Sequence, residues 1–171
     1  MNKVETNILQ DKIVIIAGGL GRIGKKFTEC VLENSGTVIV ADISENFYRK
    51  IQDDLWEDSV NISFYPLDIT SKPSILSLIE YAYGKYGRID AFVNTAFPQT
   101  KSLTGLFEDL TYEAFCESLN IHLGGYFLCA QQMALYFKKQ GYGNIINISS
   151  IQGVTLPRFD TYEGVRLTES Q

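Results

Sequence analysis

A glycine-rich turn near the start of the chain carries the residue pattern with the clearest chemical meaning. The stretch Ile13–Gly24 reads IVIIAGGLGRIG, so an apolar run leads directly into the turn. The turn contains four glycines, at Gly18, Gly19, Gly21 and Gly24. From Gly19 onward their spacing is G-x-G-x-x-G, which lets backbone N–H groups approach a pyrophosphate closely. We expect Arg22 and Ile23 to begin a helix here, whose N-terminus favours phosphate through its free N–H groups and its dipole.

Asp42 is the second feature of this pattern. It follows the apolar stretch Thr37–Ala41 and lies close to the position, roughly 20 residues after the glycines, expected of a carboxylate that binds a ribose hydroxyl. Such a carboxylate accepts a hydrogen bond from the 2′-hydroxyl of NAD and repels the 2′-phosphate of NADP. The Arg22 guanidinium favours a phosphate, but we give Asp42 more weight and predict NAD over NADP. A strand-to-helix turn that binds no ligand is the alternative interpretation of the glycines alone.

Strand-like and helix-like segments alternate along the chain, which predicts a single α/β domain over 1–171 with a doubly wound, Rossmann-type parallel sheet. We expect strands at 13–17, 37–41, 60–66, 89–94 and 144–148. We expect helices at 22–34, 45–57, 72–86 and, with a break, from 106 to 140. The apolar spacing of the first places Ile23, Phe27, Cys30 and Val31 on its inward face. Ser71 can cap the third, and Gly87 and Gly141 are expected to end the third and the last. The polar residues at the carboxyl ends of these strands are Asp42, Asp68, Asn94, Ser149 and Ser150. Ligands bind at this edge of such sheets, so we expect these residues to share one site.

Length and composition limit the classes of function. The chain has 171 residues and a formal net charge of −5, so it lacks the basic surface that binds nucleic acid. No apolar run approaches the roughly 18 residues of a membrane span. Residues 1–11 show no secretory signal, and we predict a cytoplasmic protein. Cys30, Cys116 and Cys129 lack metal-ligand spacing and His122 is the single histidine, so we expect buried thiols and no metal site.

Several segments, in order along the chain, resemble the short-chain dehydrogenase/reductase family. AGGLGRIG at 17–24 is similar to the family's glycine turn, and LDIT at 67–70 to its segment beside the adenine. YGRIDAFVNTA at 86–96 is similar to the segment that ends in N-N-A-G, with Thr95 and Phe97 replacing the second Asn and the Gly. Beyond the glycines, the resemblance implies cofactor contacts from Arg22, Ile23, Asp42, Ile43, Asp68, Ile69, Asn94, Thr95 and Ala96.

The same resemblance implies catalytic residues. GNIINISS at 143–150 is similar to the strand that delivers the family's catalytic serine, which corresponds to Ser150. His122 stands where the family has its active-site Asn, and a purely structural His122 is the alternative. The family's general acid/base is a Tyr followed four residues later by a Lys, and the match here is Tyr162 with Arg166, which keeps the charge but does not shuttle protons. Tyr162 is therefore either the catalytic Tyr or a loop residue, and we favour the loop, with the true pair beyond this chain.

These observations predict an NAD(H)-dependent oxidoreductase that transfers a hydride to or from a carbonyl or alcohol carbon. The small-molecule substrate class includes sugar derivatives, because PLDITS, NTAFP, HLGGYFL and NIINISSIQG together resemble reductases of bacterial surface-sugar modification. We expect a truncated form of a longer enzyme, which could be inactive alone, and the resemblance implies a homodimer or tetramer of the full-length form. The alternatives are a non-catalytic dinucleotide-binding protein or subunit, and a fragment that folds only by association.

Overall fold

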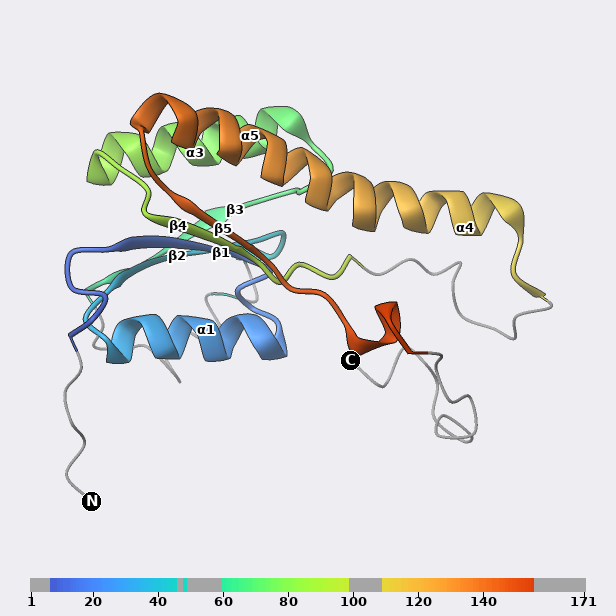
Figure 1. Cartoon of the computed structure of the whole chain (residues 1–171), viewed down its shortest axis with the longest axis horizontal. Helices are drawn as coiled ribbons and strands as arrows, with labels where there is room; N and C mark the ends of the chain where they lie inside the picture. Colours follow the sequence, from blue (N-terminus) through green and yellow to red (C-terminus); the bar gives the residue numbers. More distant parts are fainter. Residues whose placement is uncertain (1–6, 46–47, 49–59, 99–108, 156–171) are drawn as a thin grey trace, which may run out of the picture.

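Five parallel strands form one sheet in the computed structural model, which describes residues 7–45, 48, 60–98 and 109–155 (Figure 1). The strands are β1 (Ile13–Ala17), β2 (Thr37–Asp42), β3 (Ile62–Pro66), β4 (Ala91–Asn94) and β5 (Asn144–Asn147). Their order across the sheet is β3-β2-β1-β4-β5, so the chain builds outward from β1 on one side and then from β4 on the other. The predicted doubly wound, Rossmann-type sheet is confirmed.

Helices cover both faces of the sheet. α1 (Arg22–Glu33) lies on one face, and α3 (Lys72–Tyr86) and α5 (Gly125–Gln140) lie on the other (Figure 1). α4 (Tyr112–Leu119) continues into α5 through a short π-helix, η3 (Asn120–Gly124). The described helical segment is therefore continuous from Tyr112 to Gln140, and the break predicted between 106 and 140 does not interrupt this part of it. The helix predicted at 45–57 and the helix start predicted near 106 lie mostly outside the described residues.

The inner strands are apolar on both of their faces because helices cover both faces of the sheet. On the side of α3 and α5, Ile15, Ile39 and Phe92 are completely buried. On the side of α1, Ile16 and Val40 are completely buried as well. Full burial of one such side chain stabilises the fold by roughly 1.5–3 kcal/mol, so the continuous apolar runs in the sequence explain why these strands lie in the core.

Capping residues set the helix ends near the predicted positions. The Ser71 hydroxyl accepts a hydrogen bond from the backbone N–H of Ser74 at 3.4 Å, and Pro73 lies in the first turn of α3. Gly87 ends α3 with a left-handed φ of +74°, and Gly141 ends α5 with a φ of +91°. Glycine adopts this conformation without a steric penalty, which is why both helices stop there.

The face of α1 that packs on the sheet differs in part from the predicted one, since Val31 is buried and Phe27 packs against the core as predicted. The sequence pattern places Ile23 and Cys30 inward, but both are exposed, so the expectation of three buried thiols is wrong for Cys30. The buried positions of α1 are Gly24, Thr28 and Val31. Gly24 determines this orientation, because a Cβ atom there would lie only 2.2 Å from the carbonyl oxygen of Gly18. The helix therefore turns its glycine toward the preceding turn and its Ile23 side chain outward.

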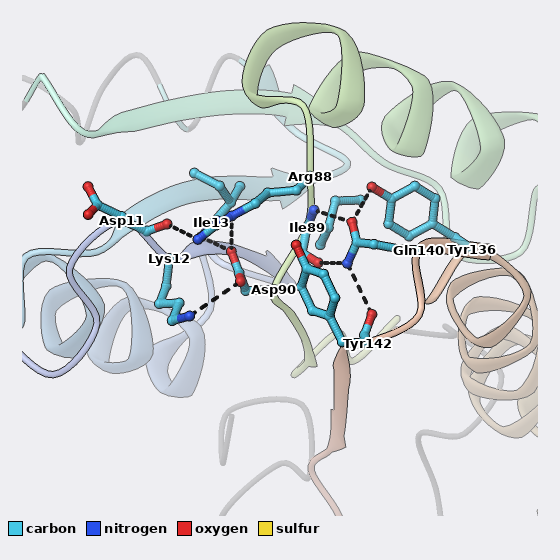
Figure 2. Close-up of polar contacts among 9 residues, drawn as sticks. All are labelled: Asp11, Lys12, Ile13, Arg88, Ile89, Asp90, Tyr136, Gln140 and Tyr142. Carbon is cyan, nitrogen blue, oxygen red and sulfur yellow. Dashed lines mark hydrogen bonds and ion pairs between the residues drawn. The ribbon is translucent and has the colours of Figure 1, made fainter. Parts of the chain in front are cut away.

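A polar network joins the strands at the amino edge of the sheet (Figure 2). One carboxylate oxygen of Asp90 accepts hydrogen bonds from the backbone N–H of Ile13 at 2.9 Å and from Nε of Arg88 at 3.0 Å. Lys12 Nζ lies 3.7 Å from the other oxygen, and the Asp90 side chain is only 10% exposed. These contacts hold the starts of β1 and β4 side by side.

Gln140, the last residue of α5, uses both ends of its side-chain amide in the same region (Figure 2). Its Oε1 accepts hydrogen bonds from the Ile89 backbone N–H at 3.2 Å and from the Tyr136 hydroxyl at 2.7 Å. Its Nε2 donates to the carbonyl oxygens of Ile89 at 2.7 Å and Tyr142 at 3.0 Å. Ile89 is completely buried, so a single side chain satisfies both backbone groups of a residue that water does not reach.

We predict that Gln140→Leu lowers the free energy of unfolding by about 2–4 kcal/mol. The substitution removes a partner from the buried N–H and C=O of Ile89, and each group left unpaired costs roughly 1–3 kcal/mol. Gln10→Leu, at an exposed position, is the matched control and should change the free energy by less than about 0.5 kcal/mol. Urea denaturation followed by circular dichroism measures both variants, and equal stabilities would contradict the role assigned to Gln140.

Candidate functional site

The glycine turn lies where the strand order reverses, between the carboxyl ends of β1 and β4. Gly18 has a φ of +72°, and a Cβ atom there would lie 2.6 Å from the Cα of Ala96. A Cβ atom at Gly24 would lie 2.2 Å from the carbonyl oxygen of Gly18. A side chain at either position would push the turn away from β4 or α1. Doubly wound sheets bind their ligands at this reversal point, so the turn occupies the expected place for a site.

The end of β4 is tied to the turn by Thr95. Its backbone N–H and its hydroxyl both donate to the Ala17 carbonyl oxygen, at 2.9 and 2.8 Å. The neighbouring Asn94 is completely buried, and its Oδ1 accepts a hydrogen bond from the Ala96 N–H at 3.2 Å. The Nδ2 atom of Asn94 has no hydrogen-bond partner among the described residues. A buried donor without a partner marks a position that a ligand or water can fill.

Asp42 is the last residue of β2, and its carboxylate contacts the turn. One oxygen accepts a hydrogen bond from the Leu20 N–H at 3.1 Å, and the other accepts one from the Ile43 N–H at 2.8 Å. A carboxylate has about four acceptor positions, so Asp42 can also accept from a ligand hydroxyl. Ile43 is 76% exposed next to it. The sequence pattern predicts Asp42 as a site residue. It does not predict the contact of Leu20 with Asp42, because Leu20 is distinguished only by its place among the glycines.

Asp68 and Ile69 follow β3 and have different surroundings. Asp68 accepts hydrogen bonds from the backbone N–H and the hydroxyl of Thr70, at 2.8 and 2.6 Å. Ile69 is buried against Gly125, where a Cβ atom would lie 2.7 Å from the Ile69 Cδ1, so this contact sets the start of α5 against the edge of the sheet. Burial, with a smaller contribution from the Asp68 charge, raises the pKa of Cys129 to about 12, so that thiol stays protonated.

His122 lies in the π-helix η3, and its surroundings bring it to the end of β4. The Tyr126 hydroxyl, on the following turn, donates to the carbonyl oxygen of Asn94 at 3.3 Å. The His122 ring packs against Phe97, with ring centroids 4.7 Å apart. Its Nδ1 lies 3.1 Å from the carbonyl oxygen of Ser118, and its Nε2 is buried without a hydrogen-bond partner among the described residues. Short π-helices are frequent at functional sites, where they redirect a side chain.

Ser150 lies just beyond β5 and is exposed, at the same edge of the sheet as the glycine turn. Its carbonyl oxygen accepts a hydrogen bond from the Gly153 N–H at 3.0 Å in the short 3-10 turn η4 (Ile151–Gly153). The strand pattern therefore places the serine as expected. Tyr162 lies outside the described residues. The structure thus brings together the glycine turn, Asp42 and the end of β4, with His122 beside the end of β4 and Ser150 just beyond the neighbouring strand β5.

A Tyr and a Lys four residues apart also occur in α3, at Tyr81 and Lys85. Lys85 Nζ donates to the Tyr81 hydroxyl at 3.2 Å, and the Tyr81 ring packs on Tyr65 of β3 with centroids 4.8 Å apart. Burial lowers the pKa of Lys85, but hydrogen bonds to the hydroxyls of Tyr81 and Tyr86 raise it overall, so the amine remains charged. β3 lies two strands away from β1, so this pair packs on an outer strand and does not contribute to the glycine-turn site.

Other classes of site have little support in the described part of the chain. No group of three or more His, Cys, Asp or Glu side chains gathers there in a way that could hold a metal ion. No described helix is both long enough and apolar enough to cross a bilayer. The three cysteines are unpaired thiols, with Cys129 buried, Cys116 half-buried and Cys30 exposed.

Known proteins resemble this chain over most of its length. A family model described as short chain dehydrogenase matches residues 12–164. The post-translational flagellin modification protein A of Campylobacter coli is 43% identical over 165 residues, which cover 95% of this chain and 64% of that protein. The 3-oxoacyl-[acyl-carrier-protein] reductase of Thermotoga maritima is 30% identical over 85% of this chain and 58% of its own length. The chain therefore spans about three fifths of these curated relatives.

Solved structures also resemble this chain. A short chain dehydrogenase from Leptospira borgpetersenii with bound NAD+ superposes with a TM-score of 0.76 at 30% identity, over 90% of this chain and 57% of that one. The protein ElxO with NADP bound gives a TM-score of 0.76 at 30% identity, over 88% of this chain and 60% of that one. Relatives with each of the two nicotinamide dinucleotides are thus present. The chain belongs to the short-chain dehydrogenase/reductase family.

Proposed function

We propose that this chain forms the NAD-binding part of an oxidoreductase that transfers a hydride to or from an alcohol or carbonyl carbon. One observation carries the proposal: the glycine turn leaves no room for side chains at the reversal point of the sheet, and the Asp42 carboxylate borders it. This arrangement fits a pyrophosphate on the turn and a ribose at the carboxylate. The bound dinucleotide would supply or accept the hydride at C4 of its nicotinamide.

The start of α1 supports a pyrophosphate at the turn. Gly21 is the N-cap residue, no side chain caps this end of the helix, and the first turn holds no acidic residue. The backbone N–H groups of Arg22 and Ile23 are then available to phosphate oxygens at the positive end of the helix dipole. Asp68 and Ile69 would border the adenine, and Asn94 to Ala96 would line the opposite side. The unpartnered Nδ2 of Asn94 fits a polar group of the bound cofactor.

Asp42 supports NAD as the cofactor. The negative charge at the end of β2 would repel a 2′-phosphate, and its remaining acceptor positions suit a ribose hydroxyl. Arg22 is exposed and could attract a phosphate, but Asp42 is already fixed beside the turn by its bonds to Leu20 and Ile43. A rigid carboxylate discriminates between the two cofactors more strongly than an exposed guanidinium that must be ordered on binding.

For the reaction itself, Ser150 would hydrogen-bond the oxygen of the alcohol or carbonyl substrate, and the proton would be exchanged by a tyrosine. Tyr162 is the candidate within this sequence, and a pair elsewhere in a longer protein is the alternative. A sugar derivative is our specific candidate for the substrate, on the sequence resemblance. Arg166 in place of a lysine favours the second candidate function, a dinucleotide-binding protein without catalysis.

We also propose that the protein forms a homodimer or tetramer through the helical segment made of α4, η3 and α5. An apolar stripe runs along it at intervals of four residues, formed by Phe115, Leu119, Leu123 and Phe127 at 47%, 45%, 67% and 63% exposure. Apolar residues at this spacing share one face of a helix, and a continuous exposed apolar face is typical of an interface. Two copies of the stripe could pack on each other about a twofold axis.

The first prediction concerns cofactor choice. Isothermal titration calorimetry should show tighter binding of NADH than of NADPH by the wild-type chain. Asp42→Asn keeps an acceptor for the Leu20 N–H but removes the charge, so the NADH preference should fall about tenfold or more, or by roughly 1–3 kcal/mol. Asp109→Asn, at an exposed position, should leave the preference unchanged. A wild-type chain that prefers NADPH, or an unaltered preference in Asp42→Asn, would refute the assignment of Asp42.

The second prediction compares two glycines. Gly24→Ala should abolish measurable NADH binding and destabilise the fold, because the new Cβ atom would displace the Gly18 carbonyl. Gly84→Ala, in α3, meets no atom within 4 Å and should raise the free energy of unfolding by roughly 0.5–1 kcal/mol while NADH binding is unchanged. Thermal melts and calorimetry measure both effects. Normal NADH binding by Gly24→Ala would argue against a pyrophosphate on this turn.

The third prediction concerns assembly. Leu123→Glu should convert the oligomer to a monomer, since the substitution places a charge in the centre of the apolar stripe. Leu76→Glu, on α3 at 40% exposure, is the matched control and should leave the assembly unchanged. Light scattering coupled to size-exclusion chromatography measures the mass of each variant. A wild-type chain that is monomeric at high concentration would exclude this interface.

A further inference from the structure

Two residues that depart from the family pattern are in contact in this structure. Phe97 stands where the pattern has Gly, and His122 stands where it has Asn. Their rings lie 4.7 Å apart between centroids, tilted by 50°. The two residues come from separate elements, the segment after β4 and the π-helix η3, so the sequence gives no hint that they meet. Their contact makes the wall beside the end of β4 aromatic.

The segment that follows His122 is held against the ends of β3 and β4. Gly125 sits tightly on Ile69, and the Tyr126 hydroxyl donates to the Asn94 carbonyl oxygen at 3.3 Å. These contacts join the turn after η3 to the ends of β3 and β4. His122 therefore cannot move away from the carboxyl edge of the sheet without breaking the packing of α5.

The surroundings of the imidazole favour a proton on Nδ1. Nδ1 lies 3.1 Å from the carbonyl oxygen of Ser118 and 3.4 Å from its hydroxyl, which can donate or accept. The carbonyl oxygen is the nearer group and only accepts, so it favours the tautomer in which Nδ1 donates. In this tautomer Nε2 carries a lone pair. That atom is buried and has no hydrogen-bond partner among the described residues. A buried acceptor without a partner is costly unless a bound molecule supplies a donor.

We propose that Nε2 of His122 accepts a hydrogen bond from a hydroxyl group of the substrate, and that His122 is thereby a specificity-determining residue. The inference rests on the proposed oxidoreductase function. Phe97 lies over the imidazole and is 65% exposed, so it can shift to admit a substrate with little loss of buried surface. A second hydroxyl next to the reacting carbon can donate to Nε2, whereas the proton of the reacting alcohol itself goes to the tyrosine and a ketone oxygen only accepts. A site built to pair with a hydroxyl discriminates strongly against compounds that lack one.

The single histidine of the chain allows a direct test. With 15N-labelled histidine, a long-range 1H–15N spectrum of the wild-type chain saturated with NADH reports both ring nitrogens. We expect a protonated Nδ1 and an unprotonated Nε2. Propane-1,2-diol, which has a second hydroxyl next to the reacting carbon, should then shift the Nε2 resonance, and propan-2-ol, which lacks that hydroxyl, should not. A protonated Nε2, or an Nε2 resonance that responds to neither compound or equally to both, would overturn the proposal; the latter results would indicate a bound water or a structural role.

Variants at His122 provide a second measurement. His122→Gln places an amide oxygen near the Nε2 position, whereas His122→Phe keeps the ring against Phe97 but removes the acceptor. Saturation-transfer NMR should show propane-1,2-diol binding within about threefold of wild type for His122→Gln and at least fivefold weaker for His122→Phe. Equal binding by the two variants would reject the role of Nε2. Calorimetry with NADH on the same samples separates this inference from the proposed function, because both variants should still bind NADH.

Discussion

The close approach of backbone to backbone at the glycine turn is the constraint on which the rest of this structure depends. Gly18 lies against the chain of Ala96, and Gly24 lies against the carbonyl of Gly18, so β1, β4 and α1 converge at one point without intervening side chains. The orientation of α1 follows from this contact, which buries Gly24 and leaves Ile23 exposed. The start of α1, where no side chain caps the helix, is placed beside the turn by the same geometry.

The two edges of the sheet differ in how their polar groups are paired. At the amino edge, Asp90 and Gln140 hold the starts of β1 and β4 and the end of α5 with side-chain hydrogen bonds (Figure 2). At the carboxyl edge, the polar groups of Asn94 and His122 include atoms with no partner among the described residues. The hydrogen bonds of Asp90 and Gln140 therefore stabilise the amino edge, whereas two buried polar atoms of the carboxyl edge have no partner in the described part of the chain.

Local patterns predicted much of this arrangement, and long-range contacts explain what they missed. The strands, the Ser71 cap, the Gly87 and Gly141 helix ends and the positions of Asp42 and Ser150 follow from periodicity and from the residues that favour turns. The inward face of α1 was predicted correctly at Phe27 and Val31 but wrongly at Ile23 and Cys30. At those two positions the tertiary contact of Gly24 outweighed the apolar periodicity. The pairing of Phe97 with His122 depends on how η3 docks on the sheet, and no local pattern encodes that distance.

The central claim is that a dinucleotide pyrophosphate binds at the glycine turn. The most direct measurement is a titration of the 15N-labelled chain with NADH, followed through backbone amide resonances. We expect the largest changes at the amides from Gly19 to Ile23 and at Asp42, with little change at Asp90 or Gln140 on the opposite edge. Changes centred on the amino edge, or saturating NADH without any change at the turn, would contradict the account.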